Sequence, residues 1–188
     1  EEESNYMSRV TKKAINQYPL LARLIFWAQK LKYGVTLEPA WYWGRSPKLL
    51  YGLQVFYRCL DRKQSPLNRR LRALVSNRIA QINTCAFCMD ISTSVLQHQA
   101  VTFEMLGILA DYESNSNFSE SERAALAYAE AMTDSAQRVN DVLFQRLSQS
   151  FSEEQIVELT AWIAFQNLSS KFNAALDIPA QGFCQTPK

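Results

Sequence analysis

The feature that most constrains this chain is a repeated pattern of helix start signals, which no strand signals accompany. No long run alternates apolar and polar residues with a period of two, and no Asn-Gly or Asp-Gly turn joins two apolar segments. Helix starts are marked instead by side chains that cap helices and by prolines, whose missing N–H costs nothing in a first turn. These signals are Tyr18-Pro19, Ser46-Pro47, Ser65-Pro66, Ser119 with Glu122, Asn140, and Ser152 with Gln155. The pattern predicts an all-α fold of about seven or eight helices.

Apolar residues spaced three and four apart predict which helices form the core. The stripe is clearest after Pro66 and over 153–176, the segment that Asp177-Ile178-Pro179 ends. Its members are Leu67, Leu71, Leu74, Val75, Ile79 and Ile82 in the first segment, and Ile156, Leu159, Ile163 and Phe165 to Leu168 in the second. A further helix is expected over 120–134. No linker is long enough to divide the chain, so we expect residues 1–188 to form a single domain.

The charge balance and the apolar runs exclude several classes of partner. The chain has 188 residues and a net charge of +2, which gives no reason to expect nucleic acid or an anionic membrane as a partner. The longest apolar stretches, such as Leu20 to Ala28, fall short of the roughly 20 residues that a membrane-spanning helix needs. The first residues lack the pattern of a secretory signal. We therefore expect a soluble, cytoplasmic protein that binds neither nucleic acid nor membrane.

Four cysteines and one histidine limit the possible chemistry. The cysteines are Cys59, Cys85, Cys88 and Cys184. Four are too few for a disulfide scaffold, and only Cys85 and Cys88 are close in sequence. Zinc needs about four ligands, yet the chain has no second CxxC pair, and a c-type haem needs a histidine where Met89 stands. A thioredoxin fold needs a βαβ unit. The pair is therefore expected to be redox active, with two inert buried thiols as the alternative.

The surroundings of the pair favour a reactive thiol. Asn83 or Thr84 can cap a new helix, which would put Cys85 in the first turn and Cys88 on the same face. The positive end of the helix dipole lowers the pKa of a cysteine there. Six basic residues and no acidic one lie between Asp61 and Asp90: Arg62, Lys63, Arg69, Arg70, Arg72 and Arg78. Any of them near the pair would favour the thiolate further, although most are expected on a solvated helix face.

Three segments carry a family resemblance. They are Leu71–Ser92 (LRALVSNRIAQINTCAFCMDIS), Ser119–Thr133 (SESERAALAYAEAMT) and Phe151–Thr160 (FSEEQIVELT). In this order they resemble the alkylhydroperoxidase D-like, or carboxymuconolactone decarboxylase, superfamily. The resemblance covers about 66–179. Residues 1–60 look like the additional N-terminal helices of some members.

The resemblance implies an all-helical fold, assembly into homotrimers or homohexamers, and peroxidase activity in antioxidant defence. In such proteins the second cysteine, here Cys88, attacks a hydroperoxide, and the first, here Cys85, resolves the product as a disulfide. No haem, flavin or metal cofactor is required, but an external dithiol reductant is. The decarboxylase branch generally lacks the cysteine pair.

Two positions depart from the family pattern. A glutamate is usual twelve positions before the first cysteine, where Ala73 stands, and a histidine four positions after the second, where Ser92 stands. These residues form the family's proton relay. We expect the helix dipole and the arginines to replace it in part, giving a slower or differently tuned peroxidase.

Four other polar residues could contribute. Ser92 lies one turn beyond Cys88 and can hold a water or donate to the thiolate. Gln81 is expected to hydrogen-bond near the site, and Asp90 to pair with Arg78 or a neighbouring subunit. His98 lies about 15 Å further along a continuous helix than Cys88, so it is expected on the surface or at an interface.

Two further alternatives follow from the same residues. The loss of both relay residues favours a non-catalytic homo-oligomeric protein with relict thiols, and the superfamily also allows a cofactor-free decarboxylase. The N-terminal aromatics are expected in the core or at an interface rather than on a substrate pocket. They are Phe26, Trp27, Tyr33, Trp41, Tyr42 and Trp43.

Overall fold

The computed structural model describes residues 8–99, 101, 107 and 109–184, and these contain eight α-helices and no strand. The α-helices are α1 (Leu20–Tyr33), α2 (Glu38–Trp43), α3 (Pro47–Leu60), α4 (Arg69–Ile82), α5 (Ala86–Gln97), α7 (Glu120–Thr133), α8 (Asp141–Ser148) and α9 (Glu153–Ala175). Short 3₁₀ turns lie at Ile15–Gln17 and Leu109–Asp111. The predicted all-α class is therefore confirmed. None of the described helices combines the length and the apolar character needed to cross a membrane.

Three of the six predicted helix starts are confirmed by the hydrogen bonds of their capping side chains. Ser119 and Ser152 form reciprocal capping boxes with Glu122 and Gln155 at the starts of α7 and α9. Asn140 caps α8. These signals were predictable because each cap joins residues only three apart.

The predicted start at Ser65-Pro66 is wrong. Helix α4 begins at Arg69, and Asn68 caps it by accepting a hydrogen bond from the N–H of Leu71 over 2.7 Å. Ser65 instead accepts from the N–H of Leu67 in a local turn. That turn sends the Leu67 side chain into the core, where it is 3% exposed, before the helix starts.

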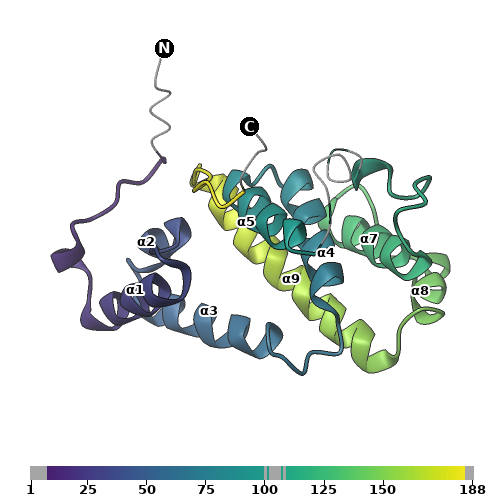
Figure 1. The fold of residues 1–188 in the computed structure, drawn as a ribbon, viewed down its shortest axis with the longest axis horizontal. Helices are drawn as coiled ribbons and strands as arrows, with labels where there is room; N and C mark the ends of the chain where they lie inside the picture. Colours follow the sequence, from purple (N-terminus) through teal and green to yellow (C-terminus); the bar gives the residue numbers. More distant parts are fainter. Residues whose placement is uncertain (1–7, 100, 102–106, 108, 185–188) are drawn as a thin grey trace, which may run out of the picture.

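Helix α4 lies at the centre of the main core, packed against α5, α7 and α9 (Figure 1). Its apolar stripe is buried as the spacing predicts: Leu74, Val75 and Ile79 are fully inaccessible to solvent. Leu159 and Ile163 of α9 join the same cluster. Helices α4 and α9 are therefore held together by the largest apolar cluster of the described residues.

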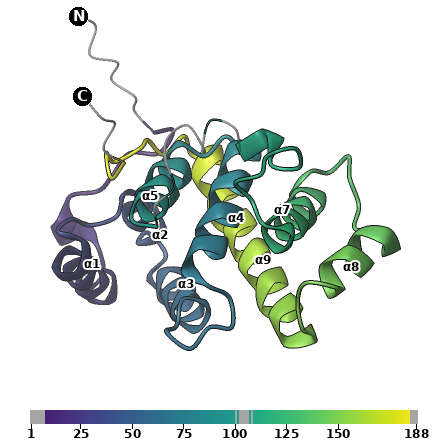
Figure 2. The same cartoon turned by 45° about the vertical axis from the view of Figure 1, so that its right-hand side comes forward.

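Helices α1 to α3 lie on the opposite side of α4 and α9 from α7 and α8 (Figure 2). They bury a smaller cluster, in which the rings of Tyr18, Phe26 and Trp41 contact one another at centroid distances of 4.6 to 5.7 Å. Trp43 of α2 stacks on Phe172 of α9 at 3.7 Å. Stacking of this kind joins the N-terminal helices to the main core.

Candidate active site

The connection between α4 and α5 positions the cysteine pair. Helix α4 ends in a Schellman motif: the N–H of Cys85 donates to the carbonyl of Ala80 over 2.9 Å, and that of Thr84 to Gln81 over 3.1 Å. Thr84 takes the left-handed conformation that this motif requires, with φ = 51°. The chain therefore reverses within three residues, and α5 begins at Ala86 beside α4.

Cys85 itself caps α5, because its Sγ accepts a hydrogen bond from the N–H of Cys88 over 3.2 Å. The prediction that Asn83 or Thr84 is the cap, with Cys85 in the first turn, is wrong. The left-handed backbone turns the Thr84 hydroxyl toward the carbonyl of Asn83. The Asn83 side chain is held by Ser170 and Asn167 of α9 over 2.7 and 3.0 Å. Cys88 is therefore the residue in the first turn.

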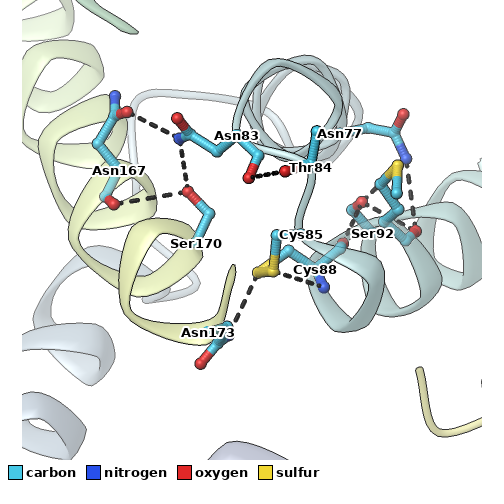
Figure 3. Close-up of a disulfide and its surroundings, with 10 residues drawn as sticks. Asn77, Asn83, Thr84, Cys85, Cys88, Ser92, Asn167, Ser170 and Asn173 are labelled. Atoms are coloured by element: carbon cyan, nitrogen blue, oxygen red, sulfur yellow. Dashed lines mark hydrogen bonds between the residues drawn. A yellow bond between two sulfur atoms is a disulfide. The ribbon is translucent and has the colours of Figure 1, made fainter. Parts of the chain in front are cut away.

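Cys85 and Cys88 are joined by a disulfide bond, with their Cα atoms 5.3 Å apart (Figure 3). Both side chains are buried, at 1% and 3% exposure. They differ in what they face, because Cys88 lines a cavity and Cys85 does not. The two sulfur atoms are thus in contact, and one of them adjoins a space large enough for a ligand.

Asn173 of α9 is the side chain whose hydrogen bond reaches Cys88. Its amide Nδ2 donates to the Sγ of Cys88 over 3.3 Å, as Figure 3 shows. The side chain is 1% exposed, and its Oδ1 has no hydrogen-bond partner among the described residues. A second Schellman motif fixes its backbone, because the N–H of Ile178 donates to the Asn173 carbonyl and Asp177 has φ = 56°.

Asn173 is not among the site residues predicted from the sequence. A signal was available: Ile163, Ser170 and Asn173 lie seven and three residues apart on the buried face of α9, so two polar residues continue an apolar stripe. A buried polar side chain needs a partner, and here the partner is the cysteine sulfur.

Ser92 lies one turn beyond Cys88, as predicted, but its hydroxyl holds the backbone. It donates to the carbonyl of Cys88 over 2.6 Å and accepts from Nδ2 of Asn77 over 2.9 Å. Ser92 and Ala73, the two positions where the family relay is missing, both line the cavity that Cys88 lines. The two positions picked out by sequence spacing therefore lie on the same cavity as Cys88, although neither alanine nor serine can act as a base there.

Gln81 belongs to a chain of hydrogen bonds that ends at this backbone. Its Oε1 accepts from Arg78 over 3.0 Å, and its Nε2 donates to Oδ1 of Asn77 over 3.2 Å. Asn77 in turn donates to Ser92. Gln81 thus supports the helix that carries Cys88, and none of its described bonds reaches a sulfur atom.

The expected field of uncompensated arginines is wrong for four of the five arginines, because acidic residues distant in sequence fold back onto them. The ion pairs are Arg62–Glu158, Arg70–Glu122, Arg72–Asp61 and Arg78–Glu130. Three of these acids come from α7 and α9, which pack on α4. The arginines therefore contribute little net field at the cysteine pair.

Asp90 anchors the C-terminal segment rather than an arginine. Its carboxylate accepts three backbone hydrogen bonds, from Gln181, Phe183 and Cys184, over 2.7 to 3.1 Å. Asp90 does not pair with Arg78, whose partner is Glu130. The anchored segment brings the ring of Phe183 to Phe87 in an edge-to-face contact and onto the cavity wall.

The cavity measures about 390 Å³, within the range of small-molecule sites. It lies between the N-terminal helices on one side and α4, α5 and α9 on the other. Trp43 and Tyr33 line it. Most of the N-terminal aromatics lie in the core as expected, since Phe26, Trp41, Tyr42 and Trp43 belong to the core clusters or pack against them. Trp43 lines the cavity as well.

His98 caps the far end of α5 and is exposed, as predicted. It nevertheless lines the same cavity as Cys88. The sequence placed it too far along the helix to act on the sulfur, and the straight run of α5 from Ala86 to Gln97 supports that argument. Its position on the cavity wall was not foreseen, because helices from the other end of the chain form part of that wall.

Comparison with known proteins decides the family. Residues 52–131 match the carboxymuconolactone decarboxylase family. The chain is 41% identical over 174 residues to the uncharacterized protein YnjA of Escherichia coli, covering 93% of this chain and 96% of YnjA. The chain belongs to the carboxymuconolactone decarboxylase family. A second relative, the uncharacterized protein YdfG of Bacillus subtilis, is 34% identical over 115 residues, which cover 61% of this chain and 78% of YdfG.

Solved structures support the alkylhydroperoxidase D-like fold of this carboxymuconolactone decarboxylase family member. A peroxidase-related protein from Ralstonia eutropha superposes with a TM-score of 0.81 at 18% identity over 94% of both chains. The debrominase Bmp8 gives 0.77 at 22% identity, covering 93% of this chain and 92% of its own. A putative antioxidant defence protein from Agrobacterium tumefaciens gives 0.68 at 25% identity, covering 74% of this chain and 95% of its own.

Proposed function

We propose that this protein is a CxxC-dependent peroxidase, a dithiol oxidoreductase that acts on hydroperoxides in antioxidant defence in the cytoplasm. The observation that carries the proposal is the asymmetry of the pair: Cys88 borders the cavity, whereas Cys85 lies behind it within bonding distance. An attacking thiol needs access to a substrate, and a resolving thiol needs access to the attacking one. The likeness to a peroxidase-related protein and to a putative antioxidant defence protein agrees with this assignment.

The reaction follows from two thiols and one peroxide bond. The Cys88 thiolate attacks one oxygen of the hydroperoxide, the O–O bond breaks, and the leaving alkoxide takes a proton to become an alcohol. Cys88 becomes a sulfenic acid. The Cys85 sulfur then attacks it, forming the disulfide and releasing water, and an external dithiol reduces the disulfide back to two thiols.

The described residues favour the thiolate by two means. Cys88 lies in the first turn of α5, where the free N–H groups and the helix dipole stabilise negative charge. The Asn173 amide donates directly to the sulfur. We propose that these two contacts take over part of the work of the missing glutamate and histidine.

Thiol counting tests the proposal. In the reduced Cys59→Ser/Cys184→Ser protein the pair supplies the only thiols, so one equivalent of cumene hydroperoxide should remove both and yield one equivalent of cumyl alcohol. A further Cys85→Ser change should leave a sulfenic acid that dimedone traps, and Cys88→Ser should leave the remaining thiol intact. Retention of both thiols over hours would overturn the peroxidase and favour a non-catalytic protein with relict thiols.

A second candidate rests on the aromatic walls of the cavity. Bmp8 is a debrominase, and a cysteine-to-alanine variant of it has been solved in complex with 2,3,4-tribromopyrrole. Here Trp43, Phe87 and Phe165 line the space beside Cys88, which suits a flat aromatic ligand. Reductive debromination would convert the two thiols to the disulfide and release an arene and HBr. Bromide release from a bromopyrrole, without peroxide, would favour this activity.

We also propose that the protein assembles into a homotrimer or homohexamer. Helix α1 exposes Leu20, Leu24, Trp27 and Leu31 at 54 to 69%, and their spacing of four, three and four places them on one face. Such a face suits burial against another helix. Light scattering should give a trimer or hexamer mass, and Leu24→Glu/Leu31→Glu should lower it.

A further inference from the structure

The cavity beside Cys88 has two chemically different ends. Helices α4, α5 and α9 pack side by side, so the order of residues along them orders the cavity wall. Cys88 lies at one end. Trp162 and Arg72 mark the other, where the indole N–H donates to the Arg72 carbonyl over 3.1 Å. From Cys88 to His98, both of which line the cavity, the α5 axis rises by about 15 Å, at about 1.5 Å per residue.

Positive charge gathers at the end away from the sulfur. Three cationic side chains, Lys32, Arg69 and Arg72, line the cavity, against the single carboxylate of Asp61. That carboxylate is already engaged, since it accepts from Arg72 over 2.7 Å and from the Tyr57 hydroxyl over 3.1 Å. Burial, with Asp61 beside it, raises the pKa of Tyr57 far above its usual range, so the phenol remains a donor.

Arg72 is buried at the end of the cavity away from Cys88, and one of its N–H donors is unpaired among the described residues. It is 8% exposed, and its guanidinium lies over the ring of Trp162 at 5.1 Å. Its Nη1 is bonded to Asp61 and to the carbonyl of Leu60, but its buried Nε has no partner among the described residues. Among the described residues, no carboxylate lies within ion-pair distance of Lys32 or Arg69.

Between the two ends the wall is mostly apolar. Leu50, Ile91, Val95 and Phe165 line it, together with the aromatic residues of the N-terminal helices. An apolar passage with cations at one end suits an amphiphilic molecule, because the hydrocarbon leaves water while the anionic group keeps a charged partner. A dianionic or strongly polar ligand would lose its hydration along the passage.

We propose that the cavity binds an organic hydroperoxide that carries a carboxylate about 15 Å from its peroxide group, the class to which fatty-acid hydroperoxides belong. The carboxylate is held by Arg69 and Lys32 with Arg72 behind them, the chain lies along the apolar wall, and the peroxide meets Cys88. This assignment rests on the proposed function for the reacting group. The recognition of an amphiphilic carboxylate is independent of it.

Binding of an unreactive analogue tests the recognition without the chemistry. Calorimetry on the Cys88→Ser protein compares dodecanoate with its methyl ester, which keeps the chain and removes the charge. Dodecanoate should bind about tenfold more tightly than the ester, as a charge-assisted hydrogen bond provides. The Lys32→Gln/Arg69→Gln change should abolish that difference and leave ester binding unaltered.

A matched variant controls for the loss of surface charge. Lys63→Gln/Lys171→Gln also removes two exposed cations, neither of which lines the cavity, and it should keep the preference for dodecanoate. Equal binding of acid and ester to the unsubstituted cavity, or no binding of either, would overturn this inference. A cysteine pair inert to hydroperoxides would overturn the proposed function instead, so the two failures are distinguishable.

Discussion

The side-chain amide of Asn173 donates to the Sγ of Cys88, and so joins the end of α9 to the first turn of α5 over 3.3 Å. This bond forms between residues 85 positions apart, and two Schellman motifs, at the ends of α4 and α9, fix the backbone on both sides of it. A donor held in this way stabilises a thiolate more than a thiol. Asn173 is thus a positioning residue for the proposed reaction.

Asn173→Leu should raise the pKa of the Cys88 thiol, because it removes this donor and keeps the volume. Attack on a peroxide at neutral pH should slow by about threefold, because the smaller thiolate fraction outweighs the higher nucleophilicity of the remaining thiolate. The rate of bimane alkylation against pH measures the pKa. Asn167→Leu makes the same change on the same helix at an amide whose described bonds reach Asn83 and Thr133 rather than a sulfur atom, and it should leave the pKa unchanged. Equal pKa values in the Asn173→Leu and unsubstituted proteins would refute the role.

Ser92→Ala should lower the stability of the fold and leave the pKa of Cys88 unchanged. Its hydroxyl bonds the carbonyl of Cys88 and the amide of Asn77, and no bond to a sulfur atom is found among the described residues. Removal should destabilise the fold by about 1 kcal/mol, since Asn77 keeps its bond to Thr93. The alkylation pKa of Cys88 should not move. A shifted pKa of Cys88 with unchanged thermal stability would contradict this prediction and indicate that Ser92 acts directly on the Cys88 thiol.

The sequence predicted the local features of this site and missed the distant ones. The capping boxes at Ser119 and Ser152 and the relay positions at Ala73 and Ser92 depend on spacing within one or two helices. The contact of Asn173 with Cys88 depends on how α9 packs across α5. The carboxylates that neutralise Arg70 and Arg78 likewise come from α7, about fifty residues away. Helical periodicity carries no information on such pairings.

Thr84→Gly should stabilise the protein by about 1 kcal/mol. Thr84 has φ = 51°, a conformation that costs a β-branched residue energy and glycine almost none. Chemical denaturation of the reduced protein measures the change. Thr84→Ala is the control, because it also removes the bond from the hydroxyl to the Asn83 carbonyl but keeps the Cβ. A glycine variant no more stable than the alanine variant would refute the strain.

Asp90→Ala should release the C-terminal segment. The carboxylate is the shared acceptor for the N–H groups of Gln181, Phe183 and Cys184, so the segment loses all three bonds at once. Phe183 should then leave the cavity wall, and the chain should be cut near residue 183 by chymotrypsin well before the helices are. Mass spectrometry of the first fragments identifies the cut. Asp177→Ala, a change to another carboxylate near this end, should not create the same early site.

Cys184 should be a slow thiol. Burial, and the negative charge of Asp90 beside it, raise the pKa of Cys184 above its usual value. At any pH below that pKa its thiolate fraction is smaller than that of an unperturbed cysteine, so iodoacetamide should label Cys184 more slowly than the exposed Cys59 at pH 8. Raising the pH should narrow the gap, because both thiols then ionise. The Asp90→Ala change should also narrow it at pH 8, since it removes the charge and exposes the tail. Equal labelling rates at pH 8 in the unsubstituted protein would refute the shift.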